Sequence, residues 1–102
     1  MKNLQSIFTT NLLCYLKEHE ENGRHFSDIC REGPFPKGTL GTLTSGRVDN
    51  PTYNTAYKLA KVLWVPMEAF AARTRAERET HCKTIRHGFK EKRLLQAIHG
   101  DT

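Results

Sequence analysis

Glycine and proline interrupt the first seventy residues at short intervals, and this spacing most limits what the chain can fold into. Proline lacks an amide N–H and ends or kinks a helix, and glycine is common just after a helix ends. Between these breaks, apolar residues recur three and four positions apart, which is typical of helices with one buried face. The sequence therefore predicts several short helices. The breaks stand at Gly23, Gly33-Pro34, Gly46, Pro51 and Pro66.

The first predicted helix covers residues 6–19, with Gly23 as its C-terminal cap. Its apolar face is expected to hold Phe8, Leu12, Leu13 and Leu16, whereas Tyr15 and Lys17 are expected outside the core.

Two brief helices are predicted next, at residues 26–31 and 37–45. Ser27-Asp28 opens the first, in which Phe26, Ile29 and Cys30 share a face, and we expect both Cys14 and Cys30 to be small core residues. In the second, Leu40 and Leu43 face inward and four hydroxyl residues face out: Thr39, Thr42, Thr44 and Ser45. Gly38 and Gly41 each cost roughly 1 kcal/mol relative to alanine, so tertiary contacts must hold this helix.

A fourth helix is predicted over residues 52–63, because Ala56, Leu59, Ala60 and Leu63 follow the helical repeat. A fifth starts at residues 65–70, with Pro66 in its first turn. Trp64, between these two helices, is interpreted as a core or interface residue.

The remaining residues, 71–102, form a basic helical extension. Helices are expected over residues 77–86 and 89–98, divided at Gly88. The few large apolar residues there can be buried either against the core or against a second chain. The eight basic residues form either a solvated face or a track for phosphates: Arg73, Arg75, Arg78, Lys83, Arg86, Lys90, Lys92 and Arg93.

Charge and size narrow the classes of function. The 102 residues fit one folding unit, with a DNA-binding domain expected at 1–70 and an extension at 71–102, and they leave no room for a large enzyme. The net charge is +5, and half of the 16 lysines and arginines lie in residues 71–102 with only 4 of the 11 acidic residues. This excess favours a polyanionic partner such as nucleic acid.

Membrane insertion and secretion are not expected. No apolar run approaches the roughly 20 residues of a bilayer span, and the N-terminus lacks the apolar stretch of a signal peptide. Cys14, Cys30 and Cys82 are an odd and widely spaced set, which argues against a disulfide framework and for a reducing compartment. We therefore expect a cytoplasmic protein.

Metal binding, cofactor binding and catalysis are also not expected. His81-Cys82 and the more distant His87 do not match the paired spacing of structural zinc ligands. No glycine-rich phosphate loop and no nucleophile elbow is present, and His81 beside Cys82 is only a sequence neighbour. We expect no enzyme activity.

The pattern of residues 26–65 is more specific. Two short helices with a tight Gly/Pro connection inside a small bundle is the arrangement that places one helix in a DNA major groove. Residues 43–47, Leu-Thr-Ser-Gly-Arg, are similar to the "Ile-Glu-Asn-Gly-Lys" of the lambda-repressor-like, or XRE-type, helix-turn-helix family, and residues 59–65, Leu-Ala-Lys-Val-Leu-Trp-Val, are similar to its "Ile-Ala-Lys-Ala-Leu-Gly-Val". The likeness spans roughly residues 7–70.

This resemblance implies an all-α fold, a five-helix lambda-repressor-like bundle followed by the basic extension, with a helix-turn-helix at residues 27–45. It implies base contacts from Lys37, Gly38 and Thr42. It implies phosphate contacts from Ser27, Thr39, Thr44, Ser45 and Arg47. A lysine can donate to guanine, and a threonine offers a hydroxyl and a methyl to a groove. The segment lacks the glutamine and arginine that often dominate base recognition, so we expect either modest specificity or specificity that depends on DNA shape and on the tail.

The hypothesis from sequence is a DNA-binding transcriptional regulator, a phage- or bacterial-type repressor that acts as a homodimer on double-stranded operator DNA. The alternative is an antitoxin-like or inhibitor module whose tail, residues 71–102, binds a protein partner. Recovery of one preferred half-site from random duplexes would distinguish the first from the second.

Overall fold

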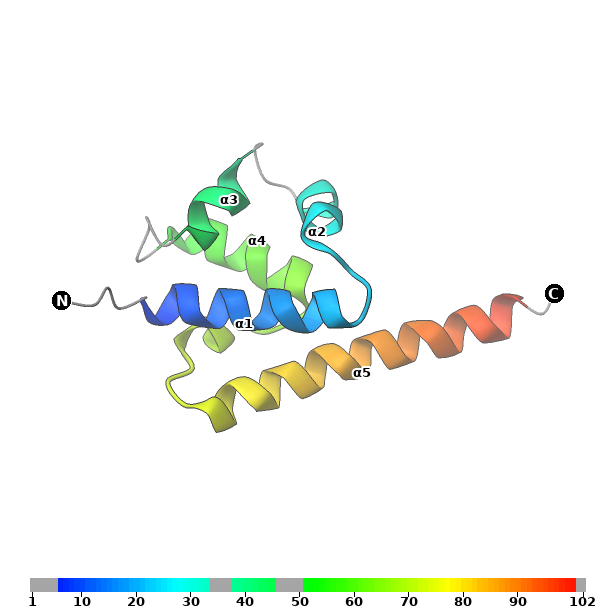
Figure 1. Ribbon diagram of the computed structural model, residues 1–102. Helices are drawn as coiled ribbons and strands as arrows, with labels where there is room; N and C mark the ends of the chain where they lie inside the picture. Colours follow the sequence, from blue (N-terminus) through cyan, green and yellow to red (C-terminus); the bar gives the residue numbers. More distant parts are fainter. Residues whose placement is uncertain (1–5, 34–37, 46–50, 101–102) are drawn as a thin grey trace.

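The computed structural model describes residues 6–33, 38–45 and 51–100. Within these ranges the secondary structure is entirely helical, which confirms the all-α prediction (Figure 1). In chain order the elements are α1 (Ile7–Glu21), α2 (Phe26–Glu32), α3 (Thr39–Thr44), α4 (Tyr53–Leu63), the 3-10 helix η1 (Met67–Ala71) and α5 (Arg75–Gly100). None of the helices in the described ranges combines the length and the apolar content needed to cross a bilayer.

Helix α1 is the central element and packs against α3, α4, η1 and α5. The Ser6 hydroxyl caps its N-terminus by accepting from the Thr9 amide at 3.1 Å, and Gly23 follows its end with a left-handed φ of 93°, as expected of a C-terminal glycine. Phe8, Leu12 and Leu16 are buried as predicted, and Leu13 is half-buried.

Tyr15 was expected outside the core, and this prediction is wrong. Its side chain is fully buried and its hydroxyl donates to the Ala69 carbonyl at 2.6 Å. Two elements cover this side of α1, because both η1 and α5 pack on it. The buried surface of α1 is therefore wider than the single apolar face that the sequence predicts.

Helices α2 and α3 are short, as predicted. Leu40 and Leu43 are buried, which confirms the inward side of α3, and Ile29 anchors α2. Cys30 is exposed, so its assignment to the core is wrong, and Phe26 is also 41% exposed. Ile29 is thus the one apolar side chain of α2 that is buried in the core.

Helix α4 begins after Thr52, whose hydroxyl accepts from the Thr55 amide at 3.2 Å. Leu59, Ala60 and Leu63 are buried as predicted, while Ala56 is half-buried. The expected fifth helix at residues 65–70 is the 3-10 helix η1, which starts after Pro66 and contributes buried Ala69 and Phe70. 

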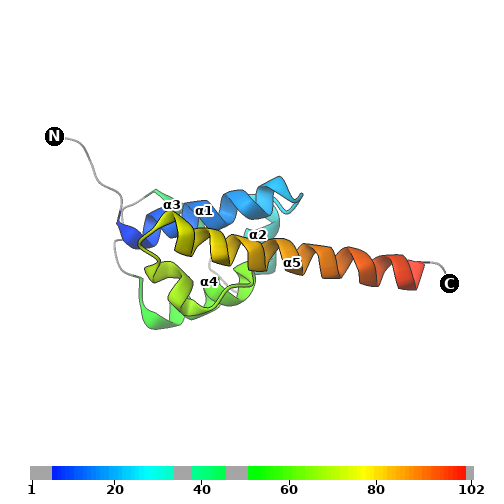
Figure 2. The ribbon, with the colours of Figure 1, turned by 90° about the horizontal axis from the view of Figure 1, so that it is seen from below.

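The extension is one helix of 26 residues, so the predicted division at Gly88 is wrong. Gly88 lies inside α5 because it packs against the indole of Trp64, which would stand 3.0 Å from a Cβ at this position. The first half of α5 runs along α1 and adds Cys82 and Ile85 to the core (Figures 1 and 2). The second half projects beyond the end of α1.

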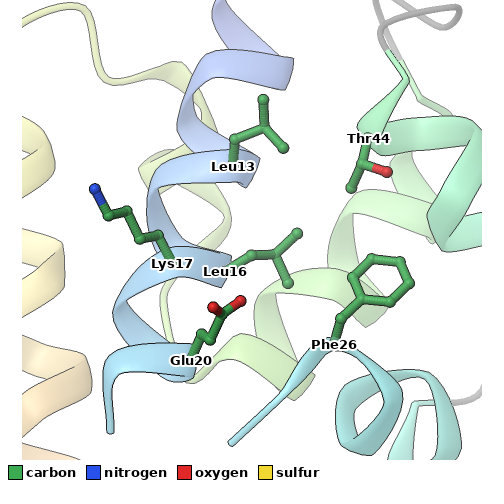
Figure 3. Close-up of a pocket in the computed structure, with 6 residues that line it drawn as sticks. All are labelled: Leu13, Leu16, Lys17, Glu20, Phe26 and Thr44. Atoms are coloured by element: carbon green, nitrogen blue, oxygen red, sulfur yellow. The ribbon is translucent and has the colours of Figure 1, made fainter.

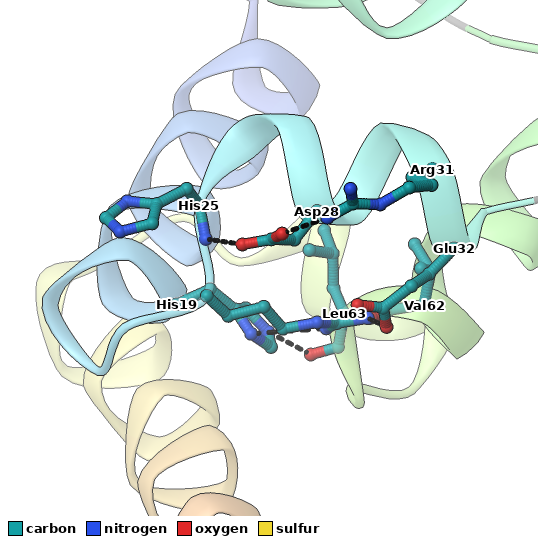
Figure 4. A network of polar contacts seen from close by, with 8 residues as sticks. His19, His25, Asp28, Arg31, Glu32, Val62 and Leu63 are labelled. Carbon is teal, nitrogen blue, oxygen red and sulfur yellow. Dashed lines mark hydrogen bonds and ion pairs between the residues drawn. The ribbon is translucent and has the colours of Figure 1, made fainter.

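A polar network joins α1, α2 and the end of α4 (Figure 4). Arg24 is buried and donates from Nη1 to the Val62 carbonyl at 2.5 Å, and its Nη2 lies 2.7 Å from Oε1 of Glu32. Nε2 of His19 donates to the Leu63 carbonyl at 2.9 Å, since a carbonyl can only accept. This network fixes where α2 starts relative to the core.

Candidate nucleic-acid interface

One edge of α3 is exposed along its whole length. Gly38, Gly41, Thr42 and Ser45 are exposed, whereas Leu40 and Leu43 on the opposite side are 2% and 4% exposed. Helix α1 separates α3 from α5 (Figure 1), so the described part of α5 does not cover this edge. Leu40 and Leu43 thus anchor α3 to the core, and the small polar residues on its other side stay exposed.

The hydroxyl groups of this surface are bonded to the helix itself. Thr42 Oγ1 donates to the Gly38 carbonyl at 3.1 Å, Thr44 Oγ1 to Gly41 at 3.0 Å, and Ser45 Oγ to Thr42 at 2.7 Å. A hydroxyl that donates inward keeps its oxygen lone pairs for an outside donor. In this state Thr42 can accept from an N–H group such as the cytosine or adenine amino group in a major groove. A bond to phosphate, which only accepts, requires the hydroxyl to rotate away from the helix.

Bare backbone lies beside these hydroxyls. No heavy atom stands within 4 Å of the position that a Cβ would take at Gly38 or Gly41. Gly38 also has φ of 87°, a left-handed conformation that disfavours any other residue, and its carbonyl receives the first bond of α3 from the Thr42 amide. A partner can therefore approach the α3 backbone closely.

The predicted contact residues divide into two groups. Gly38, Thr39, Thr42, Thr44 and Ser45 lie together in or next to α3, with Thr39 and Thr44 half-buried. Ser27 is exposed in the first turn of α2. Lys37 and Arg47 lie outside the described residues.

A shallow groove connects the start of α2 with the end of α3. It has a volume of about 280 Å³ and is lined by Leu13, Leu16, Lys17, Glu20, Phe26 and Thr44 (Figure 3). Figure 3 shows the ring of Phe26 and the side chain of Thr44 on the same side of this groove. Ser27, a predicted phosphate contact, directly follows Phe26 in the first turn of α2. The groove was not anticipated, because Phe26 was expected in the core.

Asp28 directly follows Ser27 in α2, and its charge is offset locally. Oδ2 accepts from the His25 amide at 2.9 Å, and Oδ1 pairs with Arg31 (Figure 4). The His25 amide, and then the Arg31 charge, lower the pKa of Asp28. The carboxylate therefore repels an incoming polyanion less than a free acidic side chain would.

Exposed aromatic and basic side chains are also present on α4, outside the predicted set. Tyr53, the first residue of α4, is 76% exposed, and Lys61 Nζ lies 5.2 Å from the ring centroid of half-exposed Tyr57. Such hydroxyl and ammonium groups can donate to phosphate oxygens. The sequence could have indicated these residues, because the two tyrosines lie outside the clear apolar stripe of α4.

The remaining sequence expectation that the structure bears on concerns metal binding. In the part of the chain that the structure describes, no three histidine, cysteine, aspartate or glutamate side chains are grouped so as to hold a metal ion. No family model, no curated protein and no solved structure matches this chain.

Proposed function

We propose that this protein binds double-stranded DNA through a helix-turn-helix at residues 27–45, with α3 in a major groove, and regulates transcription as a repressor of phage or bacterial type. The observation that carries the proposal is the exposed edge of α3, held from behind by Leu40 and Leu43. A recognition helix needs a rigid backing and a face small enough to enter the groove, and both are present in α3.

The roles of the residues follow from their positions. Lys37, Gly38 and Thr42 meet base edges, where Thr42 presents an acceptor oxygen and a methyl group. Ser27, Thr39, Thr44, Ser45 and Arg47 hold phosphates and fix the register of the protein on the duplex. No described residue of α3 is charged, so the attraction to DNA comes from flanking lysines and arginines, including those of the extension.

Repression requires only that the protein occupies its site on the DNA. The protein acts in the cytoplasm as a homodimer on two half-sites about one helical turn apart, and the bound dimer excludes polymerase from an overlapping promoter. Residues 1–70 supply the DNA-binding unit, and the projecting half of α5 in the extension, residues 71–102, supplies the dimer contact. Leu94 and Leu95, exposed by 56% and 55%, support this role for α5.

Selection from a pool of randomised duplexes, followed by gel-shift titration, tests the proposal. The chain should enrich one half-site and lose affinity as salt rises, because phosphate contacts release counterions. Thr42→Val removes the hydroxyl at nearly constant shape and should reduce the preference for the selected site. Thr84→Val is the matched control, since Thr84 is an exposed threonine of α5 that also donates to the carbonyl four residues earlier.

Two charged residues complete the test. Lys37→Ala should relax sequence preference, whereas Arg47→Ala should weaken binding to all duplexes alike. If Thr42→Val, Lys37→Ala and Arg47→Ala all bind like the unchanged chain, α3 is not the recognition helix.

A second candidate function rests on the same exposed leucines of α5. In an antitoxin-like or inhibitor module, Leu94 and Leu95 would bury in a protein partner rather than in a second copy. This function predicts that no duplex is enriched, whereas the repressor predicts one preferred half-site.

A further inference from the structure

Two cysteines far apart in the sequence meet where α5 packs on α1. Sγ of Cys14 lies 3.8 Å from Sγ of Cys82, although 68 positions separate them. Cys82 is 4% exposed and Cys14 is half-buried. Cys30, the third cysteine, is exposed on α2 and takes no part in the pair.

The pair opens to a cavity of about 560 Å³ at the surface. Cys14 and Cys82 line it together with Arg75, Arg78 and Glu79. In the described ranges Arg75 has no carboxylate partner, and the Arg78 guanidinium donates to the side-chain oxygen of Asn11 at 3.4 Å. The cavity therefore carries an excess of positive charge beside the more accessible of the two sulfur atoms.

Two thiols in contact can either share a metal ion or form a disulfide. A structural metal site needs further ligands around the sulfurs, and no group of three such side chains exists among the described residues. A disulfide needs no further ligand, and it requires the sulfurs to come closer by about 1.8 Å, from 3.8 Å to the bond length of about 2.05 Å. Cys14 has room for this movement because its side chain borders the cavity.

We propose that Cys14 and Cys82 form a thiol–disulfide exchange site for small disulfides that carry carboxylates, and that exchange joins α1 to α5 through an intramolecular disulfide. Arg75 and Arg78 attract the carboxylates to the cavity. The site is separate from the proposed recognition surface, since α3 lies on the other side of α1 (Figure 1).

The exchange proceeds in two balanced steps. The Cys14 thiol loses its proton to solvent, and its sulfur attacks one sulfur of the external disulfide, which releases one thiolate and leaves a mixed disulfide on Cys14. The Cys82 thiol then loses its proton and attacks Cys14 Sγ, which forms the internal disulfide and releases the second thiolate. The two cysteines lose two electrons, and the external disulfide gains them as two thiols.

The order of attack follows from the surroundings of the sulfurs. Burial, and then the neighbouring Cys14 sulfur, raise the pKa of Cys82 to about 12, so Cys82 is a poor first nucleophile. Once Cys14 is bound in the mixed disulfide, its sulfur no longer carries a charge that opposes ionisation of Cys82. Cys82 then attacks Cys14 Sγ, which lies 3.8 Å from its own sulfur.

The full chain with Cys30→Ser isolates the pair for the test. It is treated with glutathione disulfide, which carries carboxylates, and in parallel with cystamine, a cationic disulfide. Intact mass and peptide mapping should show loss of two hydrogens and a link between Cys14 and Cys82. Because the bond closes a long loop, the Tm should rise by roughly 10 °C and return to its original value on reduction.

Glutathione disulfide should react faster than cystamine, and the double variant Arg75→Gln with Arg78→Gln should remove this preference.

Single-cysteine variants make the result decisive. Adding Cys82→Ala should leave a stable mixed disulfide on Cys14, and adding Cys14→Ala should abolish the reaction. The proposal is overturned if the chain with both cysteines also stops at a stable mixed disulfide, or if neither disulfide reacts with the pair while the chain stays folded. Equal rates for glutathione disulfide and cystamine would overturn the role of the arginines.

Discussion

At the scale of single residues, Trp64 shows how packing decides a backbone conformation. It ends α4 with φ of 64°, in the left-handed region where glycine is most favourable. Its ring centroid lies 4.9 Å from that of His19 and 4.6 Å from that of Phe89, and the Arg24 and Lys92 cations lie over it at 4.7 Å. Aromatic and cation–π contacts of this kind offset the strain of the conformation.

Gly88 and Gly41 form a matched pair for testing this packing. A Cβ at Gly88 would stand 3.0 Å from Trp64 Cε3, whereas a Cβ at Gly41 would meet nothing within 4 Å. Gly41→Ala should therefore raise the free energy of unfolding by up to about 1 kcal/mol through helix propensity alone. Gly88→Ala should lower it, because the indole must move. Urea unfolding of both variants checks this, and a gain at Gly88 equal to that at Gly41 would contradict it.

His19 predicts how stability depends on pH. Burial, opposed by the bond to the Leu63 carbonyl and assisted by the Arg24 charge, lowers the pKa of His19 to about 4. As the pH falls, His19 is protonated near pH 6.5 in the unfolded chain but only near pH 4 in the folded one. The folded state is therefore fully stabilised above pH 6.5, and it loses this stabilisation as the pH falls toward 4. The loss amounts to about 3 kcal/mol. Urea unfolding at several pH values should show it.

His19→Gln is the control, because the amide can still donate to the Leu63 carbonyl but does not titrate in this range. The slope of unfolding free energy against pH between 4 and 6.5 should decrease in this variant. If His19→Gln and the unchanged chain give parallel curves, His19 is not the group responsible.

At the scale of elements, the short helices were predictable and the long one was not. The repeats that contain Leu40 and Leu43, and Leu59 and Leu63, each define one buried face, and glycine and proline mark the ends. Tyr15 was misplaced because the sequence of α1 does not reveal that η1 and α5 cover a second side. The sequence predicts a break at Gly88 because its packing partner, Trp64, is far away in the chain. Of the candidate site, the sequence indicated the exposed edge of α3 but not the groove beside Phe26.

Helix α5 consists of an anchored half and a projecting half. Arg86 joins the anchored half to α1 through Glu18, with Nη1 to Oε1 at 2.9 Å, and Ile85 is fully buried. Residues 90–97 are all exposed. Changes in the projecting half should therefore affect assembly rather than folding.

Replacement of Leu94 and Leu95 by serine tests this division. We expect the double variant to keep its Tm within about 2 °C, because neither side chain is buried in the monomer. If these leucines hold the proposed homodimer, sedimentation velocity should show the unchanged chain as a dimer and the variant as a monomer. A dimer that survives the double replacement would assign the interface to another surface. Lys83→Ser, on the exposed side of the anchored half, controls for loss of helix propensity.

At the scale of the whole molecule, α1 separates two surfaces with different chemistry. The uncharged edge of α3 lies on one side, and the basic helix α5 lies on the other (Figures 1 and 2). Non-specific attraction to a polyanion would use the charges of α5, whereas sequence recognition requires the shape of α3. The central claim is that DNA contacts the α3 side.

Amide chemical-shift mapping of the labelled full chain with its selected duplex tests that claim most directly. If DNA contacts the α3 side, the largest shifts fall on Gly38, Gly41, Thr42 and Ser45, with smaller ones at the start of α2, and they persist at salt concentrations that weaken non-specific binding. Shifts confined to α5, or shifts that vanish uniformly as salt rises while α3 stays unperturbed, would contradict it.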